Sequence, residues 1–278
     1  MTVFSKALPR VCVMLGIFMA AVSSAFASEA HIVVNAATGE VLEASDADTL
    51  HYPASLTKMM TLYLAFSALK DGKLNWNDRL PISANADGKE PFKLGVGVGK
   101  EVTVREAVEG MVVLSANDAA AAIAEKLGGS EPAFGDLMTA QARRLGMTST
   151  VFRNATGLPD PAQVTTARDM ARLGIALARD FPTEFKMFSM RYITFRGMKL
   201  RGHNRLVRSY EGVDGIKTGY TKAAGYNLVT SVNRGGTRLV AAVLGGKSAQ
   251  QRDDEMASLL TRFLPAANSG IATAAGAH

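Results

Sequence analysis

The sequence predicts an α+β fold, in which strands near both ends of the chain form one antiparallel sheet and the helical middle packs as a second lobe. Segments rich in β-branched residues occur before residue 50 and after residue 190, whereas runs dense in Leu, Met and Ala lie between them. The 278 residues, 47% hydrophobic and 20% charged, are enough for one large domain or two small ones. This composition excludes a disordered, collagen-like or disulfide-stapled protein.

The first 27 residues have the pattern of a cleavable export signal. Two basic residues precede an apolar run over 11–22, and the sequence Ala-Phe-Ala over 25–27 supplies small residues at a cleavage position. The run is shorter than the ~20 residues that a membrane-spanning helix needs, so we expect cleavage rather than anchoring. Cleavage would remove Cys12, the single cysteine, and with it any disulfide or thiol nucleophile. We therefore expect an exported protein, periplasmic or extracellular, that is soluble after cleavage.

A β-hairpin is expected to open the mature chain, because β-forming segments over 31–35 and 40–43 flank a turn of small residues. The run over 55–70 is dense in Leu, Met and Ala, which predicts a mostly buried helix. A second helical run over 103–114 is interrupted at 115–118 and resumes as an alanine-rich helix ending at a Gly-Gly pair. Further helices are expected over 131–145 and 166–180.

The character of the chain changes to strands after residue 190. Strands are expected over 191–195, 215–217, 226–232 and 238–244, and a closing helix over 249–264. Within 186–208 there are seven basic and no acidic side chains, which fits a solvated hairpin turning at Arg196-Gly197 or, alternatively, a face for an anionic polymer. The expected organisation is a signal peptide over 1–27, one domain over 28–264 and a flexible tail over 265–278.

A serine and a lysine lie one helical turn apart near the start of the first predicted helix. The sequence SLTK over 55–58 places the Ser55 hydroxyl and the Lys58 amine on the same face. A lysine activates a serine when burial or a nearby positive charge lowers the pKa of the lysine amine. Ser67 and Lys70 repeat the pattern near the end of the helix, where the helix dipole would keep the lysine charged. Taken alone, Ser55 fits a helix N-cap better than a nucleophile.

Two further patterns supply what such a pair needs. Ser115 and Asn117 lie in the break between two helical runs, where a hydroxyl would relay a proton and an amide would hold a substrate's backbone. Lys217-Thr218-Gly219 lies on a predicted strand, where glycine lets a substrate come close and Lys217 attracts a carboxylate. The Ser-x-Asn pattern recurs over 83–85 and 231–233, so each copy alone predicts a turn or a cap.

The three patterns S-x-x-K, S-x-N and K-T-G, in this order, resemble the penicillin-binding proteins and serine β-lactamases. The flanking sequences PASLTKMMT, LSANDAA, ARDMA and VDGIKTGYTKAAGYNLV are most similar to the low-molecular-mass D-alanyl-D-alanine carboxypeptidase family, over roughly residues 31–264. The resemblance implies a β-lactamase/transpeptidase-like fold, with a five-stranded antiparallel sheet flanked by helices and a helical lobe.

The resemblance also implies an acyl-serine mechanism. Ser55 would attack the carbonyl between two D-alanines, with Lys58 as its general base. Ser115 would pass a proton to the departing D-alanine, and Asn117 would bind the peptide.

The K-T-G segment would bind the other end of the substrate. Lys217 and Thr218 would hold the terminal carboxylate beside Gly219. The backbone N–H groups of Ser55 and Tyr220 would form the oxyanion hole. Tyr220 departs from family members that carry histidine at this position.

The predicted function is therefore a serine carboxypeptidase that trims peptidoglycan stem peptides and is covalently inhibited by β-lactam antibiotics. A D,D-endopeptidase that cleaves cross-links with the same residues is one alternative, and a non-catalytic wall-binding or β-lactam-sensing protein is another. Many family members continue into a second domain and a membrane anchor, for which this chain is too short, so we expect no stable anchor. No E-x-x-L-N segment follows Ser115, so efficient β-lactamase activity is not expected.

Other segments carry no predicted chemistry. The glycine-rich segment over 95–100 is expected to form a turn, because Glu101 stands where a phosphate loop needs Ser or Thr. The four histidines lack zinc-like spacing, so neither metal nor cofactor is expected, and export makes nucleic acid an unsuitable partner. His203 is expected on the surface, with the border of the cleft as the alternative. Residues 253–255 are expected to form a solvated acidic helix face.

Overall fold

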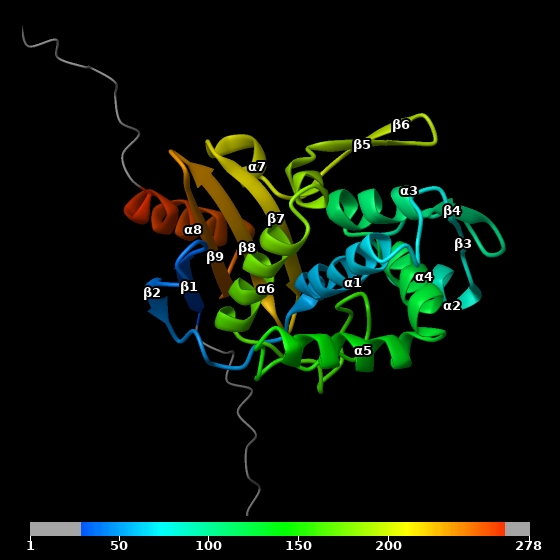
Figure 1. The fold of residues 1–278 in the computed structure, drawn as a ribbon, viewed down its shortest axis with the longest axis horizontal. Helices are drawn as coiled ribbons and strands as arrows, with labels where there is room; N and C mark the ends of the chain where they lie inside the picture. Colours follow the sequence, from blue (N-terminus) through cyan, green and yellow to red (C-terminus); the bar gives the residue numbers. More distant parts are fainter. Residues whose placement is uncertain (1–28, 265–278) are drawn as a thin grey trace, which may run out of the picture.

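The structure is a computed structural model that describes residues 29–264 (Figure 1). The export signal expected over 1–27 and the tail expected over 265–278 lie outside the described residues. Within 29–264, no helix combines the length and the apolar character needed to cross a bilayer.

One five-stranded antiparallel sheet has the strand order β2-β1-β9-β8-β7. Its strands are β1 (Ala30–Asn35), β2 (Val41–Ser45), β7 (Val213–Thr221), β8 (Gly225–Arg234) and β9 (Thr237–Gly246). The two ends of the described chain meet in this sheet, since Ile32 of β1 lies opposite Ala242 of β9. The predicted α+β class and the five-stranded antiparallel sheet that joins both ends of the chain are confirmed. The pair of β3 (Arg79–Pro81) and β4 (Glu101–Thr103) and the pair of β5 (Tyr192–Phe195) and β6 (Met198–Arg201) form two separate small sheets.

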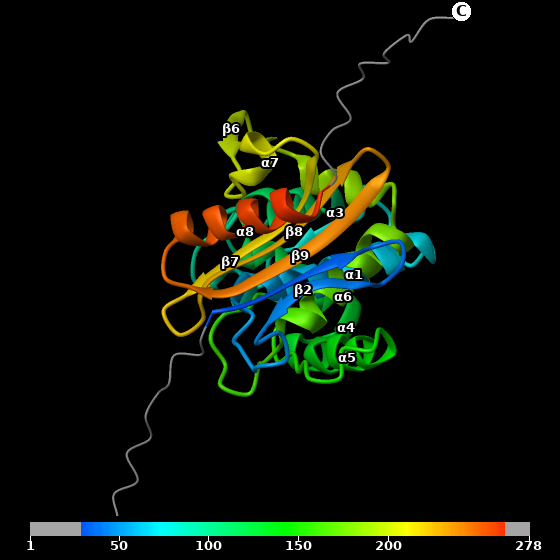
Figure 2. The ribbon, with the colours of Figure 1, turned by 90° about the vertical axis from the view of Figure 1, so that its left-hand side faces the viewer.

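Helices cover both faces of the sheet because the side chains of a strand alternate between its faces. In β9, Leu239, Ala241 and Val243 belong to the hydrophobic cluster that includes α8 (Ala249–Phe263). The intervening Val240 and Ala242 belong to the larger core with α6 (Ala167–Asp180). Figure 2 shows α8 lying along its face of the sheet.

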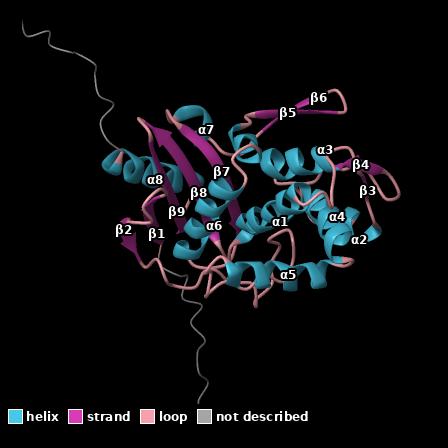
Figure 3. Cartoon of the chain, viewed as in Figure 1, coloured by secondary structure: helices cyan, strands magenta, loops and turns pink. Residues whose placement is uncertain are grey.

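The helical lobe (residues 58–144) lies beside the sheet, on the right of Figure 3. Its helices are α1 (Lys58–Lys70), α2 (Ala84–Asp87), α3 (Val104–Glu109), α4 (Asn117–Gly128) and α5 (Glu131–Arg144), with short strands β3 (Arg79–Pro81) and β4 (Glu101–Thr103) at its rim. Helix α1 is buried along most of its length, as predicted, with Met59, Leu62 and Phe66 in the core.

The segment between α6 and β7 crosses the top of the molecule in Figure 1. It holds η3 (Glu184–Ser189), the hairpin of β5 (Tyr192–Phe195) and β6 (Met198–Arg201), and α7 (Leu206–Ser209). The predicted hairpin is confirmed, since Phe195 pairs with Met198 across a turn at Arg196-Gly197.

Several local predictions are wrong. Residues Ala54–Thr57 form a 3₁₀ turn, η1, before α1 begins at Lys58, and Ser55 makes no capping hydrogen bond. The strand expected over 215–217 is longer, because β7 pairs with β8 along its whole length. The solvated acidic face expected over 253–255 is right for Asp254, which is exposed, but wrong for Asp253, which is 6% exposed and pairs with Arg252 at 2.7 Å.

Candidate active site

A cleft of about 500 Å³ lies between the edge strand β7, η1 and the helical lobe. The three sequence patterns meet there, and the residues of these patterns that line the cleft are Ser55, Ser115, Asn117, Thr218, Gly219 and Tyr220. The two lysines lie behind this lining, because Lys58 is 0% and Lys217 2% exposed. The structure therefore brings together all eight residues that the sequence singled out.

Lys58 is surrounded by three polar atoms. Its Nζ lies 2.5 Å from Asn117 Oδ1, 2.5 Å from the carbonyl oxygen of Thr156 and 3.4 Å from Ser55 Oγ. Burial, and secondly the charge of Lys217, hold the pKa of Lys58 well below its usual value. A neutral amine has two hydrogens and one lone pair. In that form Asn117 and Thr156 would accept the two hydrogens, and the lone pair would be left for the Ser55 hydroxyl proton.

Two glycines allow η1 to lie against its neighbours. A Cβ on Gly157, whose φ is +83°, would lie 1.8 Å from the carbonyl oxygen of Ala54. A Cβ on Gly219 would lie 3.1 Å from the backbone nitrogen of Ser55. The close approach that we expected for a substrate at Gly219 is thus made by η1 itself. The same contact brings the Ser55 N–H beside the segment that leads to Tyr220.

Asn227 of β8 holds η1 from the sheet side. Its Nδ2 donates to the carbonyl oxygens of Tyr52 at 2.9 Å and Pro53 at 3.2 Å, and its Oδ1 accepts from the Gly245 N–H at 2.9 Å. Asn227 is fully buried, so each of these bonds is shielded from water. A single Asn in a predicted strand carries no sequence signal for this role.

Ser115 is strained and unpaired. It adopts a left-handed φ of +61° between η2 (Gly110–Leu114) and α4, which costs free energy in a residue other than glycine. Its buried Oγ has no hydrogen-bond partner among the described residues. Both features are unfavourable for stability and place a free hydroxyl at the cleft.

Asn117 is anchored to the segment before β4 as well as to Lys58. Its backbone N–H donates to the Phe92 carbonyl at 2.6 Å, and its Nδ2 donates to the Glu90 carbonyl at 2.8 Å. With both ends of the amide engaged, its orientation is determined.

Lys217 is buried and donates to the carbonyl oxygen of Thr218 at 2.9 Å. Burial, and secondly the charge of Arg252, lower the pKa of Lys217 to about 7. Thr218 lines the cleft itself, and Tyr220 is 53% exposed with its ring against Tyr226. The K-T-G segment therefore presents a hydroxyl to the cleft with a titratable positive charge directly behind it.

The lining of the cleft is cationic. It contains no Asp or Glu but four arginines, Arg201, Arg205, Arg208 and Arg252, of which Arg252 is paired with the buried Asp253. His203 also lines it, with its ring 4.4 Å from that of Phe92. The surface position expected for His203 is thus wrong and the alternative is right. Burial, and secondly Lys217, lower its pKa to about 4, so the ring is neutral at pH 7.

The serines of the other two Ser-x-Asn copies do not line the cleft. Ser83 caps α2 by accepting from the Ala86 N–H at 3.0 Å, as expected for a capping serine. Ser231 lies inside β8 and away from the lining of the cleft. Within residues 29–264, no three His, Cys, Asp or Glu side chains lie close enough together to hold a metal ion.

The sequence profile described as D-alanyl-D-alanine carboxypeptidase matches residues 18–248. The chain belongs to this family. Among curated members, the D-alanyl-D-alanine carboxypeptidases DacA and DacC of Escherichia coli K12 are 39% and 40% identical to it. These matches cover 87% and 84% of this chain but only 62% and 60% of the relatives, so the chain spans about three fifths of their length.

Solved structures of the D-alanyl-D-alanine carboxypeptidase family and related penicillin-binding proteins share this fold. Penicillin-binding protein 5 of Haemophilus influenzae superposes with a TM-score of 0.81 and 36% identity, over 84% of this chain and 69% of that one. Penicillin-binding protein D2 of Listeria monocytogenes, bound to cefotaxime, superposes with a TM-score of 0.78 and 32% identity, over 84% and 95%. The predicted family and the predicted fold are confirmed.

Proposed function

We propose that this chain is a serine D-alanyl-D-alanine carboxypeptidase that removes the terminal D-alanine from peptidoglycan stem pentapeptides. One observation carries the proposal: the buried Lys58 amine lies within hydrogen-bonding distance of two acceptors and of Ser55 Oγ, so that its neutral form would turn its lone pair toward Ser55. A serine beside such a base is an activated nucleophile. Membership of the D-alanyl-D-alanine carboxypeptidase family supplies the substrate class.

In the first half of the reaction, Ser55 Oγ bonds to the penultimate D-alanine carbonyl carbon and its proton passes to Lys58. The developing oxyanion is stabilised by the backbone N–H groups of Ser55 and Tyr220. The peptide C–N bond then breaks, and the leaving amine takes the proton through Ser115, whose hydroxyl is unpaired. In the second half, Lys58 removes a proton from water, whose oxygen attacks the acyl carbon; the bond from that carbon to Ser55 Oγ then breaks, and Lys58 returns the proton to Ser55.

The charge of the cleft supports a substrate that ends in a carboxylate. Thr218 and Arg252 line the cleft, and Lys217 lies directly behind Thr218. A carboxylate placed here gains charge-assisted hydrogen bonds and removes unfavourable repulsion between neighbouring cations. Asn117 would hold the peptide chain on the opposite side.

We further propose that penicillin acylates Ser55 and that the protein works outside the cytoplasm after cleavage of residues 1–27. A β-lactam places a carbonyl and a carboxylate where the dipeptide does, so the same residues would react with it. Related structures of penicillin-binding protein D2 are described in forms bound to cefotaxime and to ampicillin.

The direct test is mass spectrometry of pentapeptide-rich peptidoglycan after incubation with the purified protein, beside a Ser55→Ala control. Loss of one terminal alanine with cross-linked dimers intact supports the carboxypeptidase. Disappearance of the dimers would instead assign the endopeptidase, and a product identical to the control's would leave the non-catalytic alternative.

A further inference from the structure

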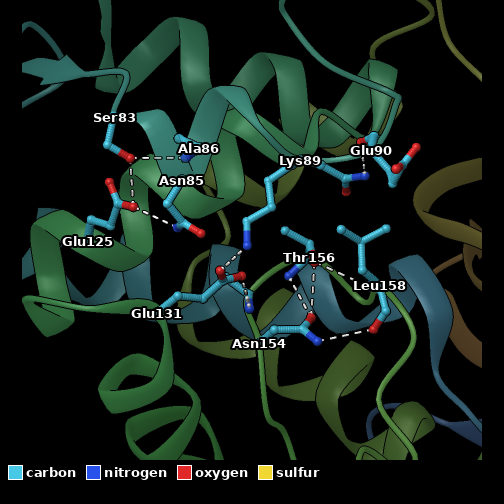
Figure 4. Close-up of polar contacts among 12 residues, drawn as sticks. Ser83, Asn85, Ala86, Lys89, Glu90, Glu125, Glu131, Asn154, Thr156 and Leu158 are labelled. Carbon is cyan, nitrogen blue, oxygen red and sulfur yellow. Dashed lines mark hydrogen bonds and ion pairs between the residues drawn. The ribbon is translucent and has the colours of Figure 1, made fainter. Parts of the chain in front are cut away.

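Glu131 is a buried carboxylate outside the three sequence patterns. It is the first residue of α5 and is 7% exposed. One of its oxygens forms an ion pair with Lys89, and the other accepts the Ala155 N–H at 3.2 Å (Figure 4). Buried ion pairs contribute little net stability, so a gain in stability does not explain why Glu131 and Lys89 are paired here.

The contact with Ala155 connects Glu131 to one of the hydrogen-bond acceptors of Lys58. Ala155 directly precedes Thr156, whose carbonyl oxygen accepts from Lys58 Nζ at 2.5 Å. The Ala155 carbonyl accepts from Thr61 of α1 at 2.7 Å, so the backbone of Ala155 is held by α5 through its N–H and by α1 through its carbonyl. The other hydrogen bonds of the turn are mostly internal. The Asn154 side chain accepts from the N–H groups of Thr156 and Gly157 and donates to the Leu158 carbonyl (Figure 4).

The contact with Lys89 connects Glu131 to the other acceptor. Lys89 directly precedes Glu90, whose carbonyl accepts from Asn117 Nδ2 at 2.8 Å. The Oδ1 of the same Asn117 accepts from Lys58 at 2.5 Å. Glu131 therefore joins the two separate segments that support the hydrogen-bond acceptors of Lys58.

We propose that Glu131 is a positioning residue that, through Ala155 and Lys89, keeps the Thr156 carbonyl and the Asn117 amide where they orient the Lys58 lone pair toward Ser55. A carboxylate suits this position because its two oxygens each accept from a different segment. Glutamine would retain an acceptor for Ala155 but turn an NH₂ group toward the Lys89 ammonium. The link to the segment holding Asn117 would then be lost.

The electrostatic surroundings of Lys58 provide a second readout. Lys217 of β7 lowers the pKa of Lys58, whereas Glu131 of α5 and Asp118 of α4 raise it. Removing the charge of Glu131, and leaving Lys89 unpaired, therefore lowers the pKa of Lys58 further. The pH at which Lys58 becomes a base should then fall.

The test rests on the proposed function and measures the acylation rate of the full chain by a fluorescent penicillin, from pH 5 to 10. We compare the wild type with Glu131→Gln, Lys89→Met and the double variant. Each single variant should acylate about tenfold more slowly at its plateau, meaning the highest rate between the acid and alkaline limbs of the pH profile, because small displacements of a base are costly. The double variant should be no slower than the slower single one, since both break one link. In Glu131→Gln the acid limb should also move to lower pH.

The matched control is Glu125→Gln, also in the helical lobe. Glu125 accepts from Ser83 and Asn85, both at 2.8 Å, but forms no hydrogen bond with Lys89, Glu90 or Ala155 (Figure 4). It should change thermal unfolding while the plateau and the acid limb stay at wild-type values. Lys89→Arg, which restores the ion pair, should recover most of the rate.

The inference is overturned if Glu131→Gln matches the wild type in both plateau and acid limb, or if Glu125→Gln slows acylation equally. If Glu131→Gln does not fold, Lys89→Met provides the test, because Lys89 is more exposed than Glu131. A wild-type plateau in Lys89→Met would then overturn the inference. A wild type that no penicillin acylates would overturn the proposed function itself, and the inference with it.

Discussion

Ser55 reacts, in this account, because of the protonation state and orientation of one neighbouring amine. Lys58 is fully buried, and its pKa is held down by burial and by Lys217. The second Ser-x-x-Lys pair of the chain lacks this environment, since Ser67 and Lys70 lie at the last turn of α1 and Lys70 is exposed. The two pairs are thus a natural comparison of the same residues in two environments.

Ser55→Ala should abolish acylation by a fluorescent penicillin, whereas Ser67→Ala should acylate within about twofold of the wild type. The hydroxyl of Ser67 has no buried base to remove its proton. Gel fluorescence after a timed reaction measures both. Equal losses in the two variants would refute the assignment of the nucleophile.

The pH dependence of kcat/KM should be bell-shaped for a peptide that ends in D-Ala-D-Ala. Lys58 acts as a base only when neutral, so activity rises as pH increases through its lowered pKa. Lys217 attracts the carboxylate only when charged, so activity falls above its pKa of about 7. Initial rates across pH 5 to 10 measure both limbs. A rate that rises only near pH 10, as for ordinary lysines, would contradict this explanation.

At this scale, the sequence predicts the reactive side chains but not all that orients them. Ser55, Lys58, Ser115, Asn117 and Lys217 belong to spaced patterns and all meet at the cleft. The Thr156 carbonyl is a main-chain atom and leaves no mark in the sequence. Arg252 and Glu131 are single charged residues on helices far along the chain, and only the fold brings them to the site.

At the scale of elements, the position of Ser55 depends on how tightly η1 is enclosed. Asn227 binds two of the carbonyls that precede Ser55, and glycines lie on both neighbouring segments. The sequence correctly predicts a helix here, and most helices and strands elsewhere, because their hydrophobic patterns are long. It misses the 3₁₀ turn because that turn results from contacts with β8 and with residue 157 rather than from local propensity.

Gly157→Ala should lower the free energy of unfolding by more than about 3 kcal/mol and slow acylation strongly, because its Cβ would meet the Ala54 carbonyl at 1.8 Å. Gly146→Ala is the control: its φ is +76°, but nothing lies within 4 Å of the added Cβ. It should cost only about 1 kcal/mol and leave acylation unchanged. Urea unfolding and acylation rates measure the two effects. Equal behaviour of the two variants would show that the enclosure of η1 is unimportant.

At the scale of the whole molecule, charge is distributed in a way that suits the proposed substrate. The chain carries a formal net charge of only +6, yet the lining of its cleft combines four arginines with no acidic residue. The sequence contains a basic segment over 186–208, for which a solvated hairpin is the favoured interpretation and a face for an anionic polymer the alternative. Both descriptions apply in part, because the hairpin tip is exposed while Arg201, Arg205 and Arg208 line the cleft.

Raising the salt concentration from about 0.05 to about 0.5 M should reduce kcat/KM for a D-Ala-D-Ala peptide by about fivefold or more, because salt screens the attraction between exposed charges. An otherwise identical peptide with a C-terminal amide should bind weakly at every salt concentration. Steady-state kinetics and competition measurements check both. If the acid and amide peptides showed the same salt dependence, the cationic lining would have no part in substrate attraction.

The most direct test of the account is the mass of the protein after incubation with penicillin, followed by peptide mapping of the modified residue. We predict the addition of one penicilloyl group per chain, located on Ser55 and absent in Ser55→Ala. An unmodified protein, or a label on Ser67 or Ser115, would contradict the central claim that the buried Lys58 activates Ser55.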